Sequence, residues 1–149
     1  MKYTEDVAKK LNSLLEKNYD SEKGYKMAAE NVKNPQLKEF FNQRAKERYD
    51  FGHELKSEIK SFGQEPDKGT SLKGDIHRGW MDIKTSLSSD NEEAVLEEAV
   101  RGEKAAVEEY NEVLKSEEIP PSTGNVLMKQ RNSITDALNK VKSLEQWKD

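Results

Sequence analysis

The chain has 149 residues, of which 33% are hydrophobic and 36% are charged, so it is long enough for one domain with a core and too short for two substantial ones. Its 25 basic and 29 acidic residues give a net charge of -4, and the basic residues are spread along the chain, which argues against a nucleic-acid-binding surface. The absence of cysteine excludes disulfides, thiolate nucleophiles and zinc-thiolate sites.

Apolar residues recur at three- and four-residue intervals in the first part of the chain, which predicts an amphipathic helix over 4–33. Asn34 and Pro35 end this helix and begin a second one over 35–62, because asparagine caps helix N-termini and proline suits the first helical position. The short connection predicts that the two helices are antiparallel neighbours.

Glycines and a proline over 63–71 predict a loop, and a shorter apolar stripe predicts a helix over 72–87. Two long helices are expected over 91–117 and 121–147. A short helix between two antiparallel pairs can carry the chain back along the bundle. We therefore predict an all-α fold: a single domain over 1–149, built as a ferritin-like antiparallel four-helix bundle with a short helix in the crossover.

Each long helix interrupts its apolar face with polar residues near its middle, when side chains are placed at about 100° per residue. A carboxylate in such a core is costly unless a cation or a metal neutralises it, so the inward acids need partners. Glu22 and Arg48 lie at similar distances from the Asn34 turn and are expected to meet. The predicted polar core consists of Asn18, Glu22, Arg44, Arg48, Glu103, Gln130 and Arg131.

Two interpretations of this core compete. Ferritin-like di-iron and di-manganese proteins use a single Glu on each of two helices and Glu-x-x-His on each of the other two. Glu22 and Glu103 occupy the places of the single glutamates, but His53, the one histidine on the long helices, falls about 160° from the centre of its stripe and should face solvent. The inward arginines would repel metal ions and bind carboxylates well.

We favour a metal-free ion-pair network with no cofactor. The alternative is a di-iron or di-manganese protein with oxidase or iron-handling activity. After a rotation of the second helix, its metal ligands would be Glu22, Glu47, Glu103 and His53.

The remaining polar residues have simpler interpretations. Tyr19, Tyr25 and Tyr110 are expected at the edge of the core with their hydroxyl groups in water. Asp20 and Glu98 are expected on solvated helix faces.

Several segments carry a resemblance to a known family: Leu11 to Leu15, Asp20 to Tyr25, Ala45 to Arg48, Gly74 to Trp80 and Arg101 to Glu103. Over nearly its whole length the chain resembles a bacterial family of ferritin-like four-helix-bundle proteins of unknown function. The resemblance implies the ferritin-like fold and suggests a stress response, but no settled activity. The chain departs from the family pattern at Val100, where an acid often stands, and at Leu138, where a histidine often stands, and both departures weigh against a metal.

The most specific stretch of this resemblance contains His77, Arg78 and Trp80. We interpret His77 as a residue that makes a structural hydrogen bond, in preference to a ligand or proton-transfer group, and Trp80 as a core anchor.

These observations favour a non-enzymatic bundle with a structural or interaction role and a protein partner that the sequence does not identify. Met27 and Tyr49 lie on outer faces, where either the crossover helix covers them or they form a homodimer surface. We expect no nucleic acid or membrane partner. Because the N-terminus has no apolar signal region, we expect a cytoplasmic location.

Overall fold

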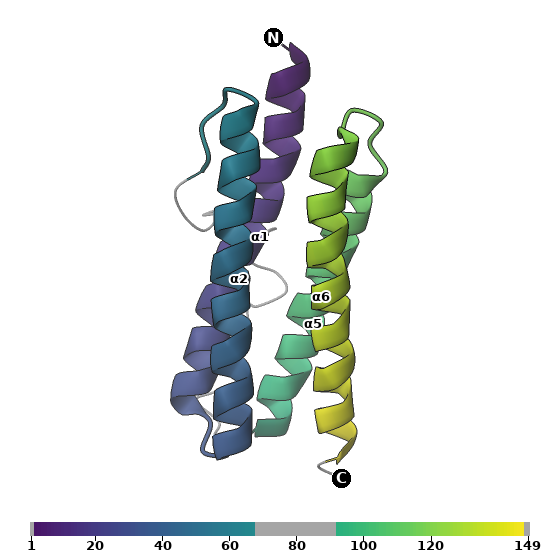
Figure 1. Ribbon diagram of the computed structural model, residues 1–149. Coiled ribbons are helices and arrows are strands. Elements are labelled where there is room, and N and C mark those ends of the chain that lie inside the picture. Colours follow the sequence, from purple (N-terminus) through teal and green to yellow (C-terminus); the bar gives the residue numbers. More distant parts are fainter. Residues whose placement is uncertain (1, 68–91, 148–149) are drawn as a thin grey trace.

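The computed structural model describes residues 2–67 and 92–147, and the regular structure within them is entirely helical. The helices are α1 (Lys2–Asn31), α2 (Pro35–Ser61), α5 (Glu92–Leu114) and α6 (Pro121–Trp147), arranged side by side as a bundle (Figure 1). Their bounds lie within three residues of those predicted. The predicted helix over 72–87, with His77, Arg78 and Trp80, lies outside the described residues.

The turn between α1 and α2 forms as the sequence predicts. The Asn34 side chain caps α2 by accepting hydrogen bonds from the backbone N–H groups of Gln36 (2.9 Å) and Leu37 (3.2 Å), and Pro35 opens the helix. The carboxylate of Glu92, at the start of α5, accepts from the backbone N–H groups of Lys33 and Asn34 at 3.0 Å each. Hydrogen bonds therefore join the first residue of α5 to this turn.

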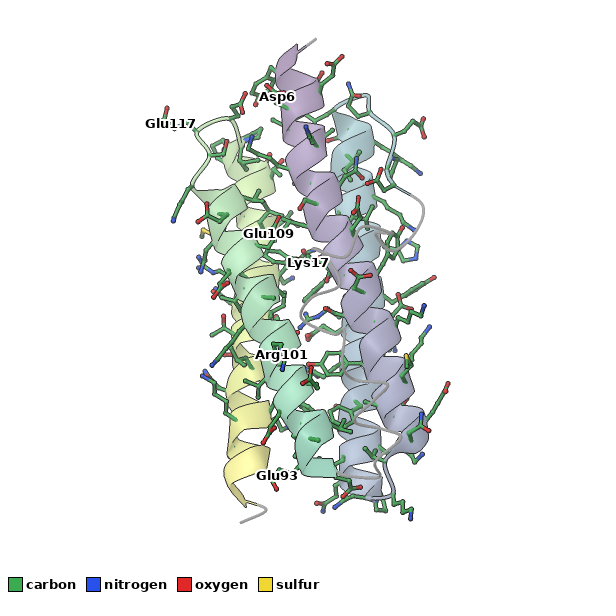
Figure 2. All side chains as sticks on the ribbon, turned by 180° about the vertical axis from the view of Figure 1, so that it is seen from behind. Asp6, Lys17, Glu93, Arg101, Glu109 and Glu117 are labelled. Atoms are coloured by element: carbon green, nitrogen blue, oxygen red, sulfur yellow. The ribbon has the colours of Figure 1, made fainter. Side chains whose placement is uncertain are left out.

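Because α2 and α5 both begin at the same end of the bundle, they run in the same direction. The chain leaves α2 at one end and enters α5 at the other, which is the connection that distinguishes a ferritin-like bundle from a plain up-down-up-down one (Figure 1). Helices α1 and α5 are antiparallel: seen from behind, α1 descends from Asp6 past Lys17 while α5 rises from Glu93 past Arg101 to Glu109 (Figure 2).

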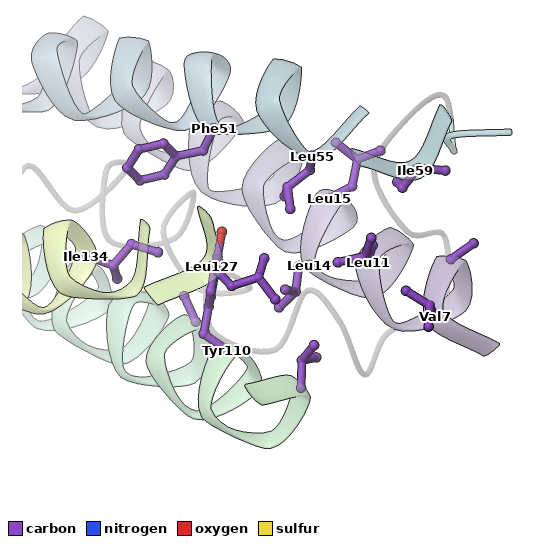
Figure 3. Close-up of a cluster of buried hydrophobic side chains, with 13 residues drawn as sticks. Val7, Leu11, Leu14, Leu15, Phe51, Leu55, Ile59, Tyr110, Leu127 and Ile134 are labelled. Atoms are coloured by element: carbon purple, nitrogen blue, oxygen red, sulfur yellow. The ribbon is translucent and has the colours of Figure 1, made fainter. Parts of the chain in front are cut away.

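Two apolar clusters fill the interior between the four described helices. One lies toward the α1–α2 turn and includes Tyr25, Phe41 and Leu96. The other lies toward the opposite end, where α1 and α2 contribute Leu11, Leu15 and Leu55 and the α5–α6 hairpin contributes Tyr110, Leu127 and Ile134 (Figure 3). The burial of these apolar side chains is the main stabilising contribution to the packing of the α1–α2 hairpin against the α5–α6 hairpin.

The middle of helix α1 is enclosed on all sides. From Lys10 to Glu22 every residue of α1 is buried or half-buried, so this stretch has no fully exposed face. After α2, the chain lies along α1, where Asn12 accepts from the backbone N–H of Asp67 at 2.8 Å and Tyr19 donates to the Asp67 carbonyl at 3.2 Å. None of the described helices is long and apolar enough to cross a membrane.

Candidate functional site

The centre of the bundle holds a buried ion pair. Arg48 of α2 donates through Nη2 to Oε2 of Glu103 of α5, and both side chains are completely inaccessible to solvent. Because burial removes the hydration of both charges, each depends on the other for neutralisation. Both residues belong to the predicted polar core, and both side chains point into the interior.

A second carboxylate lies on the other side of the Arg48 guanidinium. Oε1 of Glu47 is 3.6 Å from Nη1 of Arg48, and Oε2 of Glu47 accepts from Nη1 of Arg44 at 3.3 Å. Arg44 and Glu47 are about one-fifth exposed, so this side of the network reaches the surface. The four side chains form an alternating chain of two cations and two anions.

The electrostatic surroundings keep Arg48 charged. Burial lowers its pKa, but Glu103, Tyr25 and Glu47 together raise it more, and the net shift is upward. Burial raises the pKa of Glu47, with Glu103 and Asp136 adding to the rise and the two arginines opposing it.

Tyr25 of α1 joins the ion pair from a third helix. Its side chain is fully buried, and burial together with the negative charge of Glu103 raises its pKa well above the usual value, against the opposing effect of Arg48 and Arg44. The phenol therefore stays neutral beside the Glu103 carboxylate.

A hydrogen-bond chain crosses all four described helices at a second level. Asn18 of α1 donates to the Tyr110 hydroxyl of α5 (2.8 Å), which donates to Oε1 of Gln130 of α6 (2.6 Å). The Gln130 amide then donates to Glu54 of α2 (2.8 Å) and to the Phe51 carbonyl (3.3 Å). Asn18 and Gln130 point inward as predicted, and burial raises the pKa of Tyr110, so its hydroxyl also stays protonated.

The two polar levels are separated by one heptad on three helices. The pairs Asn18 and Tyr25, Glu47 and Glu54, and Glu103 and Tyr110 are each seven residues apart. Seven residues are close to two helical turns, or about 10 Å, so each pair projects from one side of its helix. The core thus contains two polar layers, which we call the ion-pair layer (Tyr25, Glu47, Arg48 and Glu103) and the amide layer (Asn18, Glu54, Tyr110 and Gln130).

Glu22 does not join the ion-pair layer, so the predicted meeting of Glu22 and Arg48 is wrong. Its carboxylate binds Lys26, one turn later on α1, at 2.8 Å, and its side chain is 15% exposed. The stem of Glu22 is covered by the bundle, but the carboxylate reaches the edge, where a solvated lysine neutralises it at a smaller desolvation cost than in the core.

Arg131 was also predicted in the core and lies at its edge. It donates to Asn111 at 3.1 Å and to Asn132 at 3.2 Å, because the neighbouring Gln130 takes the inward position on α6. Arg44 is intermediate: it contributes to the network through Glu47, and its Cζ lies 5.5 Å from the Phe40 ring centroid.

The expectations for the solvated faces and the tyrosines need further corrections. Asp20 is 3% exposed and Glu98 is 7% exposed, although both were expected in water. Tyr25 and Tyr110 are buried completely, so their hydroxyl groups are not wet. The sequence also missed Glu54, which accepts from Gln130 although it lies on the exposed side of α2.

The residues of the alternative metal site are not brought together. His53 is exposed, as predicted, and its ring contacts Tyr49 edge-on at a centroid distance of 4.6 Å, while Glu22 binds Lys26. The remaining two, Glu47 and Glu103, have the Arg48 guanidinium between them. Such a set does not fit a di-metal centre, since a fixed cation already occupies the carboxylates that would bind the ions.

Within residues 2–67 and 92–147, no group of three or more His, Asp or Glu side chains has an arrangement suited to a metal ion. Met27 is half-buried against the first apolar cluster, whereas Tyr49 is 51% exposed. A homodimer through Tyr49 stays a prediction.

Comparison with known proteins agrees with the fold. Residues 6–116 match the family model described as "Domain of unknown function (DUF2383)". Among solved structures, a mutant of Mycobacterium smegmatis Dps1 superposes with a TM-score of 0.82 over 97% of each chain, at 22% sequence identity. The fold is therefore the ferritin-like four-helix bundle. A search of curated proteins found no match.

Proposed function

Since the chain belongs to the family described as a domain of unknown function (DUF2383), we propose its role from the contacts in its own core. The proposal is a non-enzymatic, ferritin-like helical bundle with a structural or interaction role, in which a carboxylate-arginine network replaces a metal centre. A role in a stress response stays a prediction from the family resemblance.

The observation that carries the proposal is the position of Arg48. Arg48 has the largest fully buried side chain in the described part of the molecule. Its guanidinium is bound by Glu103 of the α5–α6 hairpin. A permanently charged guanidinium fixed at this point repels a metal ion, and it already pairs with the carboxylate that would bind the metal.

The amide layer supports a structural role in a second way. A hydrogen bond requires a defined donor and acceptor at a defined height, whereas apolar contacts tolerate sliding. Contacts among Asn18, Tyr110, Gln130 and Glu54 therefore favour one axial alignment of the four helices over its neighbours. A bundle with a unique alignment presents a constant outer surface, which suits a protein that acts through partners.

Metal analysis combined with thermal melting tests the proposal. The purified protein should contain far less than one iron or manganese per chain, and anaerobic Fe(II) or Mn(II) at tens of micromolar should leave its melting temperature unchanged. The matched control is Glu103→Gln, which should respond to the ions no differently from the wild type. Stoichiometric metal, together with a rise in melting temperature that Glu103→Gln abolishes, would establish the di-metal alternative instead.

A further inference from the structure

The surroundings of Arg48 have the chemistry of a guanidinium receptor. Glu103 accepts a hydrogen bond from Nη2, Glu47 lies 3.6 Å from Nη1, and the Phe51 ring centroid lies 5.7 Å from Cζ. Carboxylates complement the in-plane N–H groups of a guanidinium, and an aromatic ring attracts its face. Two anions and a ring thus surround one planar cation.

These groups are held in place without the help of Arg48. Glu103 is fully buried on α5, where its charge acts on the neighbouring Tyr25. The second oxygen of Glu47 is bound by Arg44. Phe51 belongs to the second apolar cluster, which also includes Leu55 and Ile134. Truncation of Arg48 would therefore leave a preformed, negatively charged site.

We propose that Glu103, Glu47 and Phe51 form a binding site for a guanidinium ion, which the chain fills with its own Arg48. The inference deepens the proposed function and rests on it, because a site built for a planar organic cation is the reason the core needs no metal. A free guanidinium ion should occupy the same site once the Arg48 side chain is truncated.

The geometry favours guanidinium over a divalent metal ion. Among the described residues, Glu47 and Glu103 are the carboxylates that face the site, and Glu47 is already bound to Arg44. A divalent ion would find few ligands there and a neighbouring positive charge. The ring of Phe51 offers nothing to a hard cation's coordination shell but stacks well with a weakly hydrated planar one.

Chemical rescue of Arg48→Ala tests the proposal. Guanidinium chloride at about 50 mM should raise the melting temperature of this variant by roughly 2 to 4 °C relative to tetramethylammonium chloride at the same concentration. The wild type should show no rise. Arg44→Ala is the matched control: it removes a guanidinium from the same network at a part-exposed position and should not be rescued. The double variant Arg48→Ala with Glu103→Ala should also lose the response.

A measurement on the wild type covers the case in which Arg48→Ala does not fold. Two separate carboxylates should hinder rotation of the Arg48 guanidinium, so its Nη protons should give resolved, slowly exchanging NMR signals that disappear in Glu103→Gln. The proposal would be overturned by any of three results. The Nη signals of Arg48 could be averaged, a folded Arg48→Ala could show no rise in melting temperature with guanidinium, or Mn(II) could raise the melting temperature of this variant more than guanidinium does. The proposed function is contradicted by a different result, namely stoichiometric metal in the purified wild type.

Discussion

At the scale of single residues, Arg48 combines two properties that rarely coincide: a complete charge and complete burial. Removing one member of a buried pair leaves the other without compensation, and this costs more than the pair contributes relative to an apolar alternative. The stability of the bundle should therefore respond far more strongly to the loss of Arg48 than to the loss of its partly exposed neighbour Arg44.

Arg48→Ala should lower the free energy of unfolding by about 3 to 5 kcal/mol, because Glu103 would remain buried and unpaired. Urea denaturation at pH 7 measures the change. Arg44→Ala, at a side chain that is 22% exposed, should cost under about 1 kcal/mol and serves as the control. A loss below about 0.5 kcal/mol for Arg48→Ala would contradict the buried pair.

The Tyr110 hydroxyl links Asn18 to Gln130 and lies wholly inside the core. Tyr110→Phe leaves the buried Oε1 of Gln130 without its donor and removes one of the two acceptors of the Asn18 amide, so we expect a loss of about 1 to 3 kcal/mol in the free energy of unfolding. Tyr3→Phe removes a hydroxyl that donates to the Glu118 carbonyl at an exposed position and should change stability by less than about 0.5 kcal/mol. Equal effects of the two substitutions would contradict the amide layer.

Helical periodicity predicted the inward direction of Arg48, Glu103, Asn18 and Gln130, because these residues lie near the centres of their apolar stripes. The same reasoning failed for Glu22 and Arg131, since periodicity gives the direction in which a side chain leaves the helix but not the place where a long side chain ends. Burial of Asp20 could not be inferred because the stripe argument assumes one exposed face, and the middle of α1 has none.

At the scale of the elements, the α1–α2 turn was predictable because its information is local. Asn34 and Pro35 specify a helix start by themselves, and the observed cap uses the Asn34 side chain. The contact between Glu92 and the same turn was not predictable, because it joins residues that are nearly 60 positions apart in the sequence.

Asn34→Ala should destabilise the protein by about 1 kcal/mol, because two N–H groups in the first turn of α2 lose their acceptor. Asn34→Asp keeps the acceptor and should retain most of the stability, which separates the loss of the cap from a general effect of substitution at the turn. Thermal or urea unfolding provides the comparison. Equal losses for the two variants would indicate that the cap contributes nothing.

At the scale of the whole molecule, the free energy of unfolding should depend on pH because Asp20 is a buried acid. Burial raises the pKa of Asp20 to about 7, with Lys17 and Lys23 opposing the rise. Since the folded state then binds this proton more tightly than the unfolded state, the contribution of Asp20 to stability is greatest at low pH. It declines as pH rises from about 4 to about 7.

Asp20→Asn should therefore gain stability relative to the wild type as pH rises, by on the order of 2 kcal/mol between pH 5 and pH 8. Urea denaturation across this range measures the difference at each pH. Asp50→Asn, at an exposed position of α2, is the control for the removal of a carboxylate from a helix surface. A pH-independent difference for Asp20→Asn would show that this carboxyl titrates alike in both states.

The heptad spacing of the two polar layers restricts how chains of this kind can diverge in length. One residue inserted between Asn18 and Tyr25 would rotate everything after it by about 100° and carry the tyrosine away from Glu103. The same holds between Glu47 and Glu54 and between Glu103 and Tyr110. Alignment gaps among relatives that retain both layers should therefore fall in the connections or toward the helix ends, and an insertion of seven residues would be tolerated better than an insertion of one.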